Sequence, residues 1–182
     1  MENVFIKERN HGTFSWTDLA NIKEGRGSLG EEMPVLVYRL MHFTMLDVLA
    51  RDLGREKANH YIHEAGRLAG KEFTKNIMDI SLPFDLFIAS LQKTLQELKI
   101  GIMRLETFDE DSGDIMLTIS EDLDCSGLPI TGETVCDYDE GFIAGILELY
   151  TLKPYTVREI DCWANGNRVC RFKCTIDRQG SI

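Results

Sequence analysis

The chain has 182 residues, enough for one domain with a sizeable core, and 43% of them are hydrophobic and 9% aromatic, as in folded globular proteins. Its 30 acidic residues outnumber 20 basic ones, which gives a formal net charge of −10. A surface of this sign repels phosphate backbones and anionic lipid, so direct binding to nucleic acid or to a membrane is not expected. No apolar segment typical of a signal peptide or a membrane span stands out. We therefore expect a cytoplasmic protein.

The N-terminal half is predicted to be helical. Residues 1–33 show no clear period and are expected to form an N-terminal arm, followed by a single domain over residues 34–182. Helices are expected over 34–53, over 55–76 and after Ser81, a good N-cap, with Pro83 in the first turn. The first of these helices is apolar nearly all round, so it must be covered on several sides.

The C-terminal half changes period. Residues 102–108 and 115–119 are predicted to be two strands with an acidic turn between them. A helix is predicted over 137–150, and a second hairpin over 155–163 and 168–176. The predicted fold class is α+β, with an antiparallel sheet of two hairpins packed against a helical N-terminal half.

The cysteines are confined to the last third of the chain: Cys125, Cys136, Cys162, Cys170 and Cys174. In a reducing cytosol, clustered cysteines more often serve metal or redox chemistry than disulfides. A hairpin turn at Gly166 would place Cys162 and Cys170 opposite each other, with Cβ atoms within about 5.5 Å, a spacing that suits zinc. Cys136 opens a helix, where backbone N–H groups favour a thiolate. The fourth ligand could be Glu159 or Cys125, while Cys174 is expected to be a core residue.

The hairpin register leaves an alternative without a metal. It places Glu159 opposite Lys173 and Asp161 opposite Arg171, as ordinary cross-strand ion pairs. Glu159 and Cys162 are an odd number of positions apart, so they face opposite sides of a regular strand. A site that both residues share therefore needs a β-bulge or a strand that ends early.

Several short motifs are spread over residues 26–176: RGSLG at 26–30, EAGRLAG at 64–70, CSGLP at 125–129, CDYDEGFIAG at 136–145 and EIDC at 159–162. Together they resemble the V4R (4-vinyl reductase) domain family, and the cysteine-bearing part is the most specific. The resemblance implies a fold related to TRAPP vesicle-tethering subunits and to haem-based NO sensors, and a tendency to dimerise.

The resemblance also implies a metal site. In aromatic-sensing bacterial transcription activators, a V4R-like domain binds phenol-type effectors in a buried pocket beside a zinc ion held by three cysteines and a glutamate. By this resemblance Cys136, Glu159, Cys162 and Cys170 are the expected zinc ligands here. Cys125 has no counterpart in those activators and offers a fourth thiolate in place of Glu159.

We expect the domain to bind or sense a small hydrophobic or aromatic ligand. Its apolar pocket is expected between the helices and the first hairpin, with a lining drawn from Phe84, Phe87, Ile88, Leu91, Met103, Leu105 and Leu117. The same residues could equally form a core without a cavity. Further alternatives are a metal-thiolate redox switch, and a tetrapyrrole vinyl reductase or its assembly partner. No Ser-His-Asp arrangement, phosphate-binding loop or dinucleotide fingerprint is present, so binding is favoured over catalysis.

The histidines do not suggest a second metal site. His60 and His63 share a helix face with Glu64, but no third ligand is near, so a solvated face is expected. His42 lies in the most apolar helix and is expected in the core or in the pocket lining.

A symmetric homodimer is expected from the first long helix. Residues 34–53 carry more apolar surface than one face can bury, and a two-fold partner offers an identical patch. Met41 and Met45 are expected inside this interface, with Arg39 and Arg51 at its rim.

Overall fold

The computed structural model describes residues 14–177, which belong to two compact units that divide between Glu32 and Met33. The described part of the first unit contains a 3-10 helix, η1 (Trp16–Leu19), and a single turn of α-helix, α1 (Ile22–Gly25). All the longer helices and the sheet lie in the second unit, which therefore holds the candidate sites.

The second unit begins with three helices, α2 (Val35–Leu53), α3 (Arg55–Ile77) and α4 (Phe84–Glu97). Two strands follow, β1 (Ile102–Phe108) and β2 (Ile115–Ser120), and then α5 (Asp137–Thr151). The chain continues through β3 (Tyr155–Asp161), a 3-10 turn η2 (Trp163–Asn165) and β4 (Cys170–Ile176). The strands pair antiparallel in the order β1-β2-β4-β3, so the two hairpins join through β2 and β4. This confirms the predicted α+β class.

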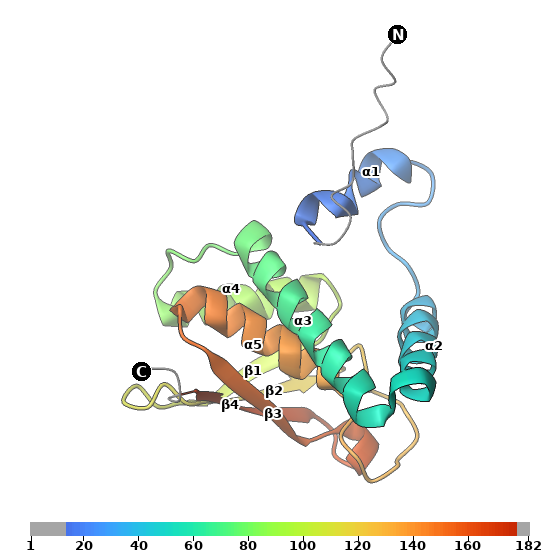
Figure 1. Cartoon of the computed structure of the whole chain (residues 1–182). Helices are drawn as coiled ribbons and strands as arrows, with labels where there is room; N and C mark the ends of the chain where they lie inside the picture. The colour runs from blue at the N-terminus through green and yellow to red at the C-terminus, as the bar shows by residue number, and fades with distance from the viewer. Residues whose placement is uncertain (1–13, 178–182) are drawn as a thin grey trace. The chain divides into compact units, whose positions relative to one another are not determined.

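The hydrophobic core lies between the sheet and the helices α4 and α5, which Figure 1 shows above one face of the sheet. Alternate residues of β2, namely Ile115, Leu117 and Ile119, are buried, as expected for a strand with one face on the core. The opposite face carries charge: Arg171 of β4 forms ion pairs with Glu106 and with Asp161. The sheet therefore has one dry face and one face with salt bridges.

Helices α3 and α5 approach each other at backbone distance. Gly66 and Gly70 of α3 face the backbone oxygens of Tyr138 and Phe142, so closely that a Cβ at either glycine would clash. Two glycines of α5 meet α3 in the same way. This contact, predicted in part from the small residues of the second helix, sets the position of α5 and of its N-terminus.

The start of α4 differs from expectation. The cap of α4 is Pro83, while Ser81 donates from its hydroxyl to Asp79, so the expected Ser81 cap is wrong. Serine hydroxyls often form local hydrogen bonds in turns, and here the Ser81 hydroxyl bonds within the turn at Asp79.

Gly54 separates α2 from α3 with a φ of 83°, a conformation that residues other than glycine rarely adopt. Within residues 14–177 none of the helices has the length and hydropathy needed to cross a membrane.

Candidate metal centre and apolar cavity

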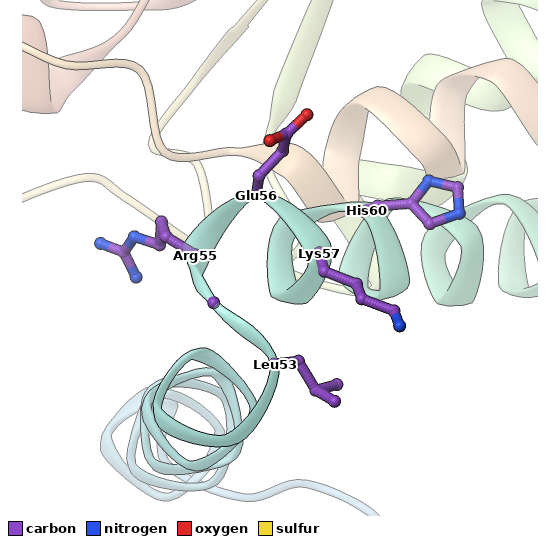
Figure 2. Close-up of a pocket in the computed structure, with 6 residues that line it drawn as sticks. Leu53, Arg55, Glu56, Lys57 and His60 are labelled. Atoms are coloured by element: carbon purple, nitrogen blue, oxygen red, sulfur yellow. The ribbon is translucent and has the colours of Figure 1, made fainter.

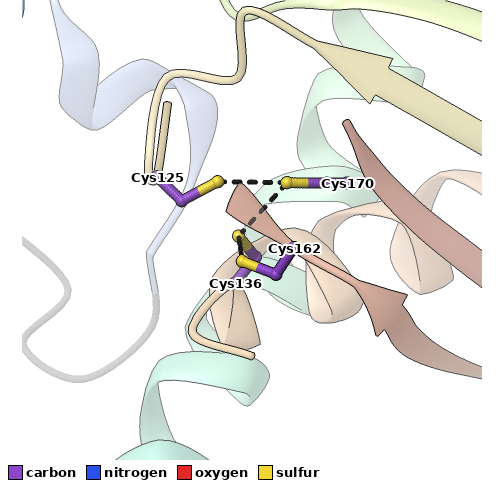
Figure 3. A group of neighbouring side chains, drawn as sticks. All are labelled: Cys125, Cys136, Cys162 and Cys170. Atoms are coloured by element: carbon purple, nitrogen blue, oxygen red, sulfur yellow. Dashed lines mark hydrogen bonds between the residues drawn. The ribbon is translucent and has the colours of Figure 1, made fainter. Parts of the chain in front are cut away.

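Four of the five cysteines converge on one point from four separate segments (Figure 3). Cys125 lies on the loop after β2, Cys136 is the N-cap of α5, Cys162 lies between β3 and η2, and Cys170 begins β4. Each is at most 1% exposed, and their sulfur atoms all lie within 4.8 Å of one another. None of the four forms a disulfide.

The separations suit a tetrahedral metal ion. Sulfurs held about 2.3 Å from zinc lie about 3.8 Å apart along each edge of the tetrahedron. The Sγ of Cys136 lies 3.8 Å from that of Cys162 and 3.8 Å from that of Cys170. Cys125 Sγ lies 3.0 Å from Cys170 Sγ, so it needs an outward movement of roughly 1 Å to match the same edge. A donor set of four sulfurs is typical of zinc or of an iron–sulfur site.

A β-bulge brings the terminal hairpin into this geometry. Asp161 pairs with Arg171 as predicted, but the register shifts between Glu159 and Asp161. As a result Glu159 lies opposite Phe172 rather than Lys173, and the predicted Glu159–Lys173 pair is wrong. The extra residue in the bulge changes the parity of the strand, which lets Glu159 and the following cysteine reach the same side.

Glu159 lies beside the cysteines, but its carboxylate is not part of the group of ligand atoms within 4.8 Å of one another. Its Oε2 accepts a hydrogen bond from the backbone N–H of Cys136 at 3.1 Å, while Oε1 is buried without a partner. Burial, together with the charge of Cys162, raises the pKa of Glu159 to about 8. The backbone N–H of Glu159 in turn donates to Glu140. Glu159 therefore fixes the backbone from which one cysteine projects.

The thiols are electrostatically coupled. Contact with Cys125 is the largest of the effects that raise the pKa of Cys136 and that of Cys170. Cys162 differs, because hydrogen bonds from Cys125, Cys136 and Cys170 lower its pKa. Because cysteines bind a metal as thiolates, metal binding to this cluster must release the protons that its thiols still carry.

The loop that carries Cys125 is fastened to α2 by contacts that the sequence did not reveal. Tyr38 donates its hydroxyl to Asp124 Oδ1 at 2.5 Å, and Arg39 donates to the carbonyls of Leu123 and Ser126 at 2.8 and 2.9 Å. The Arg39 guanidinium, which was expected at the rim of a dimer, thus binds the backbone of this loop. The partners are about 85 positions apart, so no local pattern could have indicated them.

Three acidic residues are buried next to the cysteines: Asp122, Asp124 and Asp139, at 2%, 4% and 7% exposure. Asp122 accepts hydrogen bonds from the backbone N–H groups of Asp124 and Cys125. Burial, and then the charge of Asp124, raises the pKa of Asp122 to about 6. In the sequence these acids look like ordinary loop and helix-start residues, and sequence reasoning missed them.

An apolar cavity lies between α4, α5 and the first hairpin, with a volume of about 10 Å³. Four of the seven predicted pocket residues line it: Ile88, Leu91, Met103 and Leu117. Phe84 and Phe87 instead pack on Tyr150, with Phe87 stacked at a centroid distance of 3.9 Å, and Leu105 is half-buried at the edge of the core. At this size the cavity has room for about one water molecule.

Two surface hollows are lined mainly by charged side chains. The larger, about 520 Å³, lies at the turn between α2 and α3, where Figure 2 shows Arg55 and Lys57 extending away from the helix and from each other. A second hollow of about 390 Å³ is lined by His60 and His63 among other polar residues, and His63 Nδ1 lies 3.3 Å from Glu64 Oε1. His42 is half-buried and packs on the rings of Tyr38 and Tyr138.

Comparison with known proteins gives both a family and a fold. The family model of the V4R domain matches residues 115–176. Over 145 residues the chain is 31% identical to the uncharacterized protein MJ1642 of Methanocaldococcus jannaschii, which covers 80% of this chain and 79% of that protein.

Three solved structures share the fold. The phenol-responsive sensory domain of the transcription activator PoxR, solved with phenol, has a TM-score of 0.61 at 16% identity and covers 82% of this chain and 78% of its own. A vinyl-4-reductase family protein of M. jannaschii has a TM-score of 0.57 at 18% identity, with coverages of 82% and 85%. A trafficking protein particle complex subunit 3 from Naegleria fowleri, covalently bound to palmitic acid, has a TM-score of 0.58 at 12% identity, with coverages of 80% and 98%.

Proposed function

This chain belongs to the V4R domain family, and from that premise we propose that it binds a small hydrophobic or aromatic molecule in the cavity between α4, α5 and β1–β2. The observation that carries the proposal is the lining of that cavity, which is apolar at all but one of its positions. Ligand sites of this kind are mostly apolar, with few and well-placed polar groups. PoxR, whose sensory domain has this fold, was solved with phenol, which supports the same class of ligand here.

The cavity must widen to admit a ring. Its walls include Met103 and three side chains of α4. Methionine is unbranched and polarizable, so it can adopt new rotamers around a ligand. Helix α4 contacts β1 and stacks on Tyr150 of α5 through Phe87, but it carries no salt bridge to α5 among the described residues, and we expect it to be the wall that moves. Ligand binding would then be read out as a shift of α4.

We propose that a structural zinc ion accompanies this site, held by Cys125, Cys136, Cys162 and Cys170. The support is the set of four converging sulfurs, and it favours Cys125 over Glu159 as the fourth ligand. In this arrangement Glu159 holds the backbone of Cys136. The ion would tie the loop after β2, the start of α5 and the terminal hairpin together.

The function is tested with purified full-length protein. Native mass spectrometry should show one zinc per chain and a co-purifying small molecule, or saturable binding of added phenol, toluene, indole or indene. Ile88→Trp, which fills the cavity, should weaken binding of all four at least tenfold, whereas Leu86→Trp on the exposed face of α4 should not. Absence of any bound molecule, with no saturable binding of the four compounds, would contradict the proposal.

A homodimer through α2 is the partner that the exposed surface favours. Four large apolar side chains of α2 are between 53% and 75% exposed: Leu36, Leu40, Met41 and Met45. Monomeric soluble proteins seldom expose so many neighbouring large apolar side chains. A second copy offers a matching apolar patch about a two-fold axis, so we propose that α2 pairs with α2 of the partner.

A further inference from the structure

The cavity has a single polar residue in its lining. Among its twelve lining residues only Asp139 carries a polar side chain. The other eleven are aliphatic, sulfur-containing or aromatic, among them Met103, Phe142 and Ile146. A lone carboxyl in such a wall requires a physical reason, because burying it without partners is costly.

Asp139 has one oxygen without a partner. The residue lies in the first turn of α5 and is 7% exposed. Its carboxyl lies close to that of Asp122, with one ligand oxygen of each within 4.8 Å of the other, and its Oδ2 is buried without a partner. Buried polar atoms nearly always have a hydrogen-bonding partner, so the unpaired Oδ2 points to a group that comes from outside the chain.

We propose that Asp139 is the residue that recognises the ligand, and that its Oδ2 accepts a hydrogen bond from an O–H or N–H group on an otherwise apolar molecule. The inference rests on the proposed function, because it concerns the same cavity. It names the ligand class: a neutral phenol, indole or alcohol rather than a plain hydrocarbon.

The role of Oδ2 as an acceptor does not depend on the protonation state. An ionised carboxylate accepts at both oxygens, and a neutral carboxyl whose proton faces the nearby carboxyl of Asp122 still accepts at Oδ2. In both states the matching group on the ligand is a donor.

The surroundings also select against negatively charged ligands. Asp122 and Asp124 are also buried, and their charges act on Asp139. A carboxylate ligand would meet this acidic group at close range and be repelled.

A trapped water or a metal explains the geometry less well. A buried water usually makes two to four hydrogen bonds, and this cavity offers one polar side chain. The ligand atoms of Asp122, Cys136 and Asp139 do lie within 4.8 Å of one another, but Cys136 also belongs to the four-sulfur group. A molecule that is apolar apart from one donor satisfies both the wall and Oδ2.

The test uses indole and indene, which have nearly the same shape but differ in one N–H donor. Calorimetry on the purified full-length protein should show that indole binds about tenfold more tightly than indene, as one buried hydrogen bond predicts. Asp139→Leu should remove this preference and bind indene at least as well as the wild type does. Asp137→Asn, a change in the same helical turn outside the cavity lining, should keep the preference.

The outcomes separate the two proposals. If both compounds bind the wild type with equal affinity, or if Asp139→Leu retains the preference for indole, the role of Asp139 is overturned while the ligand site stands. If neither compound binds, the proposed function itself fails. The comparison within the wild type needs no variant, so the preference for a donor is tested even where the leucine variant does not fold.

Discussion

Helices α2 and α5 have similar apolar content, but α5 is largely buried and α2 is largely exposed. Eight of the 15 residues of α5 are buried, whereas α2 buries only Leu46 among its 19. Helix α5 lies between the sheet and α3, while α2 contacts α3 along one side. Apolar content alone therefore does not determine which helix becomes central.

Small residues make the difference. Helix α5 carries Gly141 and Gly145, which press against the backbone of α3, and α3 returns the contact through Gly66 and Gly70. Helix α2 has no glycine between its ends and meets α3 through larger side chains, such as Leu46. The N-terminus of α5 is also fixed by a cysteine of the four-sulfur group, whereas α2 is fixed by polar contacts to a loop.

Removal of a cysteine should have the largest effect, because it releases the start of α5. Cys162→Ser is expected to abolish stoichiometric zinc and to destabilise the domain by several kcal/mol, since metal binding at such sites is coupled to folding. Elemental analysis and hydrogen exchange should report loss of metal and of protection in the first turn of α5 and in β3–β4. Cys174→Ser, equally buried but outside the cluster, should keep its metal. Unchanged melting of the Cys162 variant would show that the site is not structural.

The second largest effect on stability is expected from a methyl group added between α3 and α5. Gly141→Ala places a Cβ against the backbone oxygen of His63, so the helices must separate, at a cost of about 3 kcal/mol. The midpoint temperature of thermal unfolding should fall by roughly 6–12 °C. Gly27→Ala, where the added Cβ meets open space, is the matched control. Equal melting of the two variants would remove the packing explanation for α5.

The sequence predicted regular elements better than long-range polar contacts. Hydrophobic periodicity located α2 to α5 and all four strands, and cysteine spacing indicated three sulfurs together, with Cys125 as an alternative ligand. The register of Glu159 was missed because a bulge leaves no signal in residue type. The Tyr38–Asp124 contact and the burial of Asp139 depend on segments distant in sequence. Such contacts arise from tertiary packing, which no local pattern encodes.

A charge on the exposed face of α2 should change association rather than folding. Met41→Asp is expected to convert the proposed dimer to a monomer, because an unpaired carboxylate would be buried in an apolar interface. Unfolding of the isolated domain should change by less than about 1 kcal/mol, since Met41 is 54% exposed. Sedimentation velocity at micromolar concentration measures the change. Ala89→Asp, on the exposed side of α4, should leave the wild-type mass unaltered, and a wild-type monomer would refute the pairing of α2.

The most local expected effect concerns the polar attachment of α2 to the loop that carries Cys125. Tyr38→Phe leaves Asp124, which is 4% exposed, without its hydroxyl donor, and this should cost about 1–2 kcal/mol. Tyr61→Phe, at an exposed position of α3, is the control and should have almost no effect.

The consequence should be local to the loop. Amide exchange is expected to accelerate at residues 122–126 while α5 stays protected, because α5 is held independently by its glycine contacts with α3. The zinc of the Tyr38 variant should also be lost more rapidly to a chelator than that of the Tyr61 variant, since one of its four proposed ligands lies on the loosened loop. Equal rates of zinc loss would mean that Arg39 is the only residue of α2 that holds the loop, and that α2 contributes to the metal centre through a single side chain.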